Sequence, residues 1–229
     1  MVHHYYFLNE IFSALGLGHF AHKYQHVVHS WFVMLIMIIG AFFLARGIQM
    51  FPRKGQNFLE IIVDGLENFM VEITGPEGRA FFPYIATIFL YIFVSNLIGL
   101  IPGFFSPTAN YNTTLSIAIC TFVLTHVIGI KFHGAKYIKH FLGPSLALAP
   151  LVFVIEMIGH LARVMSLSIR LFGNIFGKET IIGMLFGLAG LFLAPLPMLF
   201  LGVLVSFIQA VVFMLLSIVY FSIAMEEAH

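Results

Sequence analysis

Charge is scarce in this sequence. Asp, Glu, Lys and Arg make up only 9% of its 229 residues, whereas apolar residues make up 60%. Soluble domains contain about 25% charged residues, and a soluble fold with so few could not cover its surface with polar groups. The sequence therefore predicts a protein whose solvent is the lipid bilayer. A net charge of +1 and the lack of a basic run give no indication of nucleic-acid binding.

Cysteine is almost absent, because Cys120 is the only one. A single cysteine excludes an internal disulfide framework and most cysteine metal sites, and its apolar neighbours predict a packed thiol. The first 26 residues lack the short apolar core of a cleavable signal peptide. We expect a solvated or interfacial tail there, because its histidines match no clean set of metal ligands: His3, His4, His19, His22 and His26.

Long apolar stretches dominate the rest of the chain. Five are long enough to cross a bilayer as helices: 27–45, 81–101, 114–132, 145–188 and 198–225. No internal repeat is visible. The pattern predicts an all-α polytopic membrane protein. It forms a single domain over residues 1–229, with a polar N-terminal tail (1–26) and a helical membrane region (27–229).

Residues 56–74 combine apolar and acidic side chains at helical spacing. Apolar residues recur every three or four positions, with Glu60, Asp64, Glu67 and Glu72 between them. This pattern predicts an amphipathic helix that lies at the membrane surface or against other helices.

Lys and Arg are distributed unequally between the connections. Segments 46–79 and 131–140 hold seven of the eleven, whereas connections 102–113 and 189–197 hold none. The positive-inside rule places the first two segments in the cytoplasm. We therefore expect the N-terminus outside the membrane and the C-terminus in the cytoplasm.

The stretch 145–188 is too long for an upright span. As one helix its 44 residues would measure about 66 Å, whereas the hydrocarbon core of a bilayer is about 30 Å thick. It must either break, with Gly173 and Gly177 as candidate positions, or lie strongly tilted. Because 198–225 is also long, we prefer a pair of long, steeply tilted helices. A tilt beyond the usual value of about 20° implies an external partner.

Polar side chains in the long stretch lie on one side of the predicted helix. At about 100° per residue, seven of them fall within an arc of about 120°: Glu156, His160, Arg163, Ser166, Arg170, Asn174 and Lys178. Glu179 points away from this arc. Charges at this depth cost about 3 kcal/mol or more unless they face water, each other or a charged partner. Arg170 is near the middle and has no acid three or four residues away, so we expect it to be functional.

The last apolar stretch carries no Asp, Glu, Lys, Arg or His from 189 to 225. Its Gln209 shares a helix face with Gly202, Ser206, Ser217 and Tyr220. A glutamine in lipid needs a hydrogen-bond partner, so Gln209 either joins two helices or lines a polar path.

Four segments, in order along the chain, resemble the a subunit of F-type ATP synthases. They are NLIGLIPG at 96–103, PTANYNTTL at 107–115, SLSIRLFGNIFGKE at 166–179 and QAVVFMLLSIVY at 209–220. The third surrounds Arg170, and the resemblance extends over residues 27 to 229.

This resemblance implies a membrane stator against which a ring of c subunits turns. The other implied partners are the b-subunit peripheral stalk and the rest of the F-type ATP synthase. Protons, or sodium ions in some members, reach a ring carboxylate through one half-channel and leave through another. Protons are the expected ion, no cofactor is implied, and the chain itself is expected to catalyse no covalent chemistry. The implied location is the bacterial plasma (inner) membrane.

The resemblance also implies roles for single residues. Arg170 matches the essential arginine that separates the half-channels. A fixed cation favours the ionised form of a ring carboxylate, and an arginine stays charged even when partly desolvated. Glu179 matches the acid of the outer half-channel, and Asn174 and Gln209 match polar residues close to that path.

Other positions match the inner, cytoplasmic path. Ser166 and Glu156 match residues toward it. His160 and Arg163 have weaker matches, so they either line a half-channel or pack between helices.

Three positions depart from the family pattern. Lys178 stands where relatives often have glycine, Gly202 where they often have an ionisable residue such as histidine, and Asn110 where they often have aspartate. At position 178 a large cation thus replaces a small residue, and at position 202 a small residue replaces an ionisable one. We therefore expect Lys178 to fill the space over Gly202, a hypothesis that fails if Lys178 points into lipid or the cytoplasm.

Two other classes of protein fit less of the sequence. A haem-carrying membrane anchor of a respiratory oxidoreductase needs paired axial histidines on facing helices, and His126 and His160 are the clearest intramembrane candidates. An intramembrane serine protease needs a nucleophile turn, which residues 143–147 only half resemble. Ser145 in that segment is better explained as a helix cap.

Overall fold

The computed structural model describes residues 6–14, 16, 18–46, 54–134, 137, 149–189 and 195–226. The regular elements in these ranges are all helical: α1 (Phe7–Ala14), α2 (Gly18–Lys23), α3 (Gln25–Arg46), α4 (Lys54–Thr74), η1 (Pro76–Phe81), α5 (Phe82–Ile98), η2 (Pro107–Ala109), α6 (Tyr111–His133), α8 (Ala149–Ala189) and α9 (Pro195–Met225). Five segments are long and apolar enough to cross a membrane, namely α3, η1 with α5, α6, α8 and α9. The predicted all-α polytopic fold with five spans is confirmed. Among the residues discussed above, His3, His4, 143–147 and 227–229 lie outside the described ranges.

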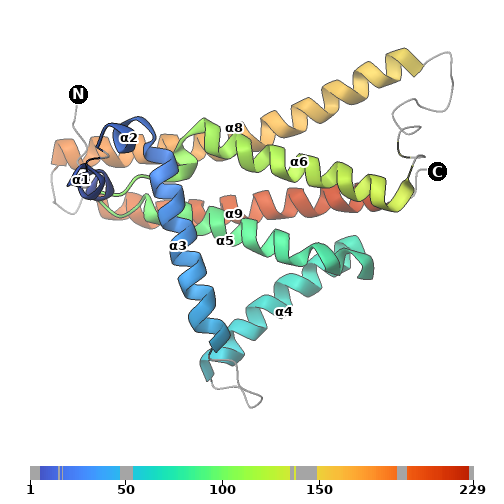
Figure 1. Cartoon of the computed structure of the whole chain (residues 1–229), viewed down its shortest axis with the longest axis horizontal. Helices are drawn as coiled ribbons and strands as arrows, with labels where there is room; N and C mark the ends of the chain where they lie inside the picture. The colour runs from blue at the N-terminus through green and yellow to red at the C-terminus, as the bar shows by residue number, and fades with distance from the viewer. Residues whose placement is uncertain are drawn as a thin grey trace.

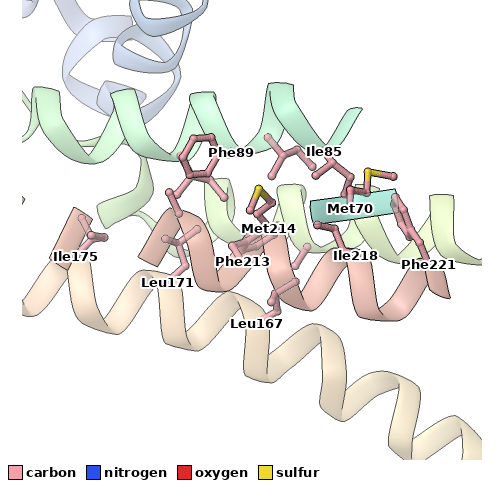
Figure 2. Close-up of a cluster of buried hydrophobic side chains, with 14 of the residues drawn as sticks. Met70, Ile85, Phe89, Leu167, Leu171, Ile175, Phe213, Met214, Ile218 and Phe221 are labelled. Carbon is pink, nitrogen blue, oxygen red and sulfur yellow. The ribbon is translucent and has the colours of Figure 1, made fainter. Parts of the chain in front are cut away.

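Helix α9 is the centre of the bundle. It contacts α4, α5, α6 and α8, and α6 and α8 contact each other. Figure 1 shows α5, α6, α8 and α9 extending in the same general direction, with α3 crossing α9 at a steep angle. Figure 2 shows Phe89 of α5, Leu171 of α8 and Phe213 of α9 among the buried side chains that fill the space between helices. In lipid, such close packing holds helices together where the hydrophobic effect cannot.

The outer surface of the bundle is apolar. Trp31 and Phe43 of α3, Ile158 of α8 and Phe200 of α9 are exposed. A membrane protein presents such a surface to lipid tails. Cys120 is also exposed, on α6, so the prediction of a packed thiol is wrong. A thiol behaves as a small apolar group and can face lipid.

Helix α4 is amphipathic, as predicted. Met70 is fully buried in the main core, whereas Glu60, Asp64 and Glu72 are exposed. Arg79, in the following turn, forms an ion pair with Glu67. The C-terminal part of the helix therefore packs through its apolar side against α5 and α9, whereas Ile61 and Ile62 remain exposed.

Helix α8 is one unbroken helix of 41 residues. At about 1.5 Å per residue it is ~62 Å long, and Figure 1 shows that it bends without breaking. A break at Gly173 or Gly177, one of the two expected alternatives, is therefore wrong. A break would expose backbone groups to lipid at several kcal/mol each, whereas a glycine inside a helix costs only about 1 kcal/mol. Fitting α8 within a bilayer core of about 30 Å requires strong tilt.

The N-terminal segment packs on the membrane helices. Leu8 of α1 and Ala21 of α2 are buried in a small apolar cluster with the start of α3. The backbone N–H of Phe7 donates to the carbonyl of Gly103, 3.0 Å away. The sequence did not predict this packing, whereas the solvated or interfacial location of the tail stays a prediction. Leu8 and Phe12 are four residues apart and give α1 an apolar face.

Candidate ion-translocation site

The polar residues of α8 occupy two environments. Ser166 and Arg170 are exposed on an open face, where a Cβ added at Gly173 or Gly177 would meet no atom within 4 Å. The neighbouring face packs against other helices and buries Lys178 at 5% exposure. His160, at 8% exposure, is buried on the same side. The predicted arc thus crosses the boundary between the open face and the packed face.

Arg170 presents its guanidinium on the open face. Its Nη2 donates to the hydroxyl oxygen of Ser166, 3.4 Å away. In the described part of the chain, no carboxylate lies within ion-pair distance of this guanidinium. A cation so placed in an apolar span is costly to leave unneutralised. Arg170 is therefore available to a carboxylate on a partner that approaches the open face.

Asn174 and Gln209 join α8 to α9. The amide nitrogen of Asn174 donates to Oε1 of Gln209 across 2.7 Å, and Gln209 is only 4% exposed. The hydrogen-bond partner expected for Gln209 is thus a residue of the neighbouring helix. This pair lies one turn along α8 from Arg170 and orients the two helices at that level.

Lys178 points into the protein. Its Nζ donates to the carbonyl of Asn96 at 3.2 Å and to the hydroxyl of Ser206 at 3.0 Å. A Cβ built on Gly202 would lie 3.3 Å from Cδ of Lys178 and 2.6 Å from Leu100. The lysine stem therefore fills the space over Gly202, which agrees with the hypothesis of a compensated exchange.

Glu179 points toward the connection between α5 and α6, away from the other polar residues of α8, as its helical angle predicts. Its Oε1 accepts a hydrogen bond from the backbone N–H of Ser106 at 2.9 Å. A Cβ added at Gly99 would lie 2.5 Å from this oxygen and 2.6 Å from Cβ of Ser106. Only glycine at position 99 leaves room for the carboxylate.

Ser106 links Glu179 to a buried polar network that the sequence did not reveal. The Ser106 hydroxyl donates to the carbonyl of Ser95 at 2.9 Å and lies 2.8 Å from Oγ1 of Thr108. Thr108 donates to Oδ1 of Asn96 at 2.5 Å. Asn96 and Thr108 belong to two of the family-like segments, but their pairing depends on how the connection between α5 and α6 folds back.

Some buried polar atoms at this end have no hydrogen-bond partner among the described residues. They are Nδ2 of Asn96, Nε2 of His29 and both side-chain polar atoms of Asn9. Buried polar atoms are almost always bonded, to protein or to ordered water, so these atoms are candidate positions for bound water. Tyr6 packs edge-on against His29, with ring centroids 5.8 Å apart. Burial raises the pKa of Tyr6, and the charge of Glu179 adds to that rise.

A second polar cluster lies toward the N-terminal end of α8. Nε2 of His160 is 3.4 Å from Oε1 of Glu156. The imidazole centroids of His160 and His126 are 4.9 Å apart, and Nδ1 of His126 forms a 2.7 Å hydrogen bond with the hydroxyl of Tyr137. Glu156 and His160 were predicted as site residues, whereas Tyr137 was missed. His126 was noted only as a possible haem ligand.

Arg163 lies between this cluster and Arg170. Its guanidinium is 5.5 Å from the centroid of the Tyr220 ring, within range of a cation–π contact. Beside Arg163 and His160 is a cavity of about 20 Å³, which has room for one water molecule.

The histidine pair does not fit a haem. With metal–nitrogen bonds of about 2 Å, two axial imidazoles have centroids ~6 Å apart and a macrocycle between them. The centroids of His126 and His160 are only 4.9 Å apart. Within the described ranges, no three His, Cys, Asp or Glu side chains are grouped as metal ligands.

Comparisons with known proteins agree with this geometry. A family model described as ATP synthase A chain matches residues 27–222. The chain is 58% identical over 229 residues to an ATP synthase subunit a of Desulfosudis oleivorans. It is 53% identical over 240 residues to one of Syntrophobacter fumaroxidans and 51% identical over 232 residues to one of Geotalea daltonii. Each of these matches covers 100% of both chains.

Proposed function

The chain belongs to the ATP synthase A chain family, and on this premise we propose how its polar side chains carry protons across the membrane. It is a multi-pass membrane protein and the proton-translocating stator of an F-type ATP synthase. In this proposal it catalyses no covalent chemistry, and ATP is made by other subunits of the complex.

The exposed, unneutralised guanidinium of Arg170 is the observation that carries the proposal. The ring of c subunits packs against the open face of α8, where Gly173 and Gly177 leave space. A ring carboxylate that passes Arg170 is held in its ionised form, because a nearby cation favours the charged state. The same cation repels protons that would leak directly between the two half-channels.

The outer half-channel leads to Glu179. Support comes from the polar network through Ser106, Thr108 and Asn96, and from the buried polar atoms that require water. Glu179 accepts a proton from this water and passes it to a ring carboxylate near Arg170. Asn174 and Gln209 lie beside the route, and the ammonium of Lys178 stabilises the negative charge of the adjacent Glu179.

The inner half-channel runs from Ser166 past Arg163 and His160 to Glu156. Support comes from the water-sized cavity beside Arg163 and from the partial exposure of Glu156, whose side chain is 33% exposed. A proton released by the ring leaves along this path. Each proton that crosses contributes about 2.3 kcal/mol per 100 mV of membrane potential.

Orientation and assembly complete the proposal. The N-terminus lies outside the bacterial plasma membrane and the C-terminus in the cytoplasm, as the distribution of Lys and Arg favours. The b-subunit peripheral stalk holds the chain against the turning ring. Such an external partner accounts for the strong tilt that the length of α8 requires.

Replacing Arg170 with alanine tests the assignment. We expect coupled ATP synthesis by the complex in energised vesicles to fall below ~1% of the parent, because preorganised charges of this kind contribute about a hundredfold or more. The control is Arg79→Ala, which removes an exposed arginine from outside the path. Proton-driven synthesis at the normal rate in Arg170→Ala would refute the proposal. Varying sodium and a proton uncoupler separately identifies the coupling ion.

A further inference from the structure

Two imidazole rings, from His126 on α6 and His160 on α8, are in contact near the inner end of the proposed path, with their planes tilted relative to each other. Their centroids are 4.9 Å apart and their planes are inclined by 58°. Phe122 packs edge-on against both rings, at 4.3 Å from His126 and 5.8 Å from His160. The pair is therefore fixed in place by an aromatic side chain of α6.

Each ring has a polar partner, and the partner of His160 is a carboxylate that can accept a proton. Nδ1 of His126 bonds to the hydroxyl of Tyr137 at 2.7 Å, and Nε2 of His160 is 3.4 Å from Oε1 of Glu156. Burial raises the pKa of Tyr137 and the charge of Glu156 adds to that rise, although Arg163 opposes it, so the phenol keeps its proton. The side chain of Glu156 is 33% exposed, so the carboxylate is not enclosed by the helices.

The cavity of about 20 Å³ lies beside His160. It is lined by Thr121 and Thr125 of α6, His160 and Arg163 of α8, and Tyr220 of α9. The rest of the lining is mostly apolar, so His160 and Arg163 are the groups with which a water molecule there would form hydrogen bonds. Leu167, one turn before Arg170 on α8, also lines the cavity. The cavity therefore lies between His160 and the part of α8 that carries Arg170.

The charges around the pair limit how many protons it can hold. Among the residues that the structure describes, the charged or titratable groups near the pair include Glu156 and Arg163 from α8, Tyr220 from α9 and Tyr137. Two charged imidazoles at this spacing would repel each other and Arg163, while the single carboxylate of Glu156 can neutralise only one positive charge.

We propose that His160, positioned by His126, relays protons between the cavity beside Arg163 and Glu156 at the inner end of the path. This inference rests on the proposed function. A water molecule in the cavity gives a proton to one ring nitrogen of His160, and the other nitrogen releases its proton to Glu156. Only N–H and O–H bonds form and break, so no other reactant is needed. Imidazole suits this step because its two nitrogens can bind and release a proton near neutral pH.

The test measures passive proton flux through the membrane part of the assembled complex in vesicles. The pH on the side that corresponds to the cytoplasm is varied between about 5 and 8. For His160→Gln we expect flux about tenfold below the parent and loss of the titration step in this range, because glutamine hydrogen-bonds but cannot relay a proton. The control is His133→Gln. His133 lies on α6 and contacts the backbone carbonyl of Ala224 at 3.2 Å, away from the pair.

A second variant separates a relay from a structural role. His126→Gln can keep a hydrogen bond to Tyr137, and we expect it to shift the midpoint of the titration step while flux persists. If His160→Gln prevents assembly, the profile of His126→Gln decides the matter. Parent-like flux and pH dependence in an assembled His160→Gln complex would overturn the relay, as would an unshifted midpoint in His126→Gln. If Arg170→Ala still abolishes coupled synthesis, only the relay has failed and the proposed function stands.

Discussion

Helix α8 carries one carboxylate toward each end, and the two are held by different means. Glu179, toward the C-terminal end, accepts a hydrogen bond from a backbone N–H and fits against Gly99 with no room for a methyl group. Glu156, toward the N-terminal end, is partly exposed, and its neighbour His160 is itself titratable. Backbone geometry therefore fixes Glu179, the proposed outer acid, whereas a titratable side chain lies beside Glu156, the proposed inner acid.

In the proposed function, this difference indicates where proton movement through each half-channel is restricted. A carboxylate fixed by the backbone in a closed network receives protons only along the route that the network leaves open. A carboxylate at a partly open surface exchanges protons with bulk water, and neighbouring side chains can substitute for it. The outer end should therefore tolerate substitution poorly and the inner end well.

Glu179→Gln should have the largest effect of the three substitutions that test this contrast. Glutamine keeps the volume of the side chain but cannot relay a proton, so we expect ATP-driven proton pumping in vesicles to fall about a hundredfold. Assembly should persist, as measured by co-purification of the complex. Glu72→Gln, at an exposed position of α4, is the control. Pumping close to the parent rate would show that Glu179 is not on the path.

Gly99→Ala should have the next largest effect. The added methyl group would overlap Oε1 of Glu179 and Cβ of Ser106 and displace the carboxylate from its backbone donor. We expect pumping to fall about tenfold, since a displacement of about 1 Å already costs one to two orders of magnitude in positioned chemistry.

Gly40→Ala is the matched control for that substitution, because a Cβ there meets no atom within 4 Å. An assembled Gly99→Ala complex that pumps as well as Gly40→Ala would mean that the outer acid is not tightly positioned.

Glu156→Gln should have the smallest effect. Water and His160 remain at this end to accept protons, so we expect pumping to fall only about two- to threefold, in line with the small contributions of exposed ion pairs. The measurement is the same vesicle assay, run beside Glu179→Gln. An equal or larger loss for Glu156→Gln would reverse the comparison and make the inner end the restricted one.

The sequence predicted much of the fold because the fold depends on local composition. Apolar runs gave the five spans, and the mixed pattern of 56–74 gave the amphipathic α4. The continuity of α8 could not be decided from composition, since glycine weakens a helix while lipid penalises a break. The packing of α1 was missed because it depends on contacts with residues such as Phe104, far along the chain.

In the candidate site, too, features that depend on local sequence were predictable and features that depend on distant contacts were not. The direction of Glu179 follows from helical periodicity alone, but its donor Ser106 is 73 residues away and depends on the fold of the α5–α6 connection. The place of Lys178 over Gly202 was predictable because two departures from the family pattern compensate each other in size. The contact of His126 with His160 was not predictable. The sequence around a single histidine does not show whether that histidine is functional or only packed between helices.

The glycines on the open face of α8 have a mechanical consequence. Helices usually lock together when ridges of side chains on one fit into grooves on the other. At Gly173 and Gly177, α8 has no side chain that would interlock with a neighbouring helix. In the proposed function, a ring that moves along this surface would meet little resistance between steps, so that Arg170 could attract each ring carboxylate and then release it.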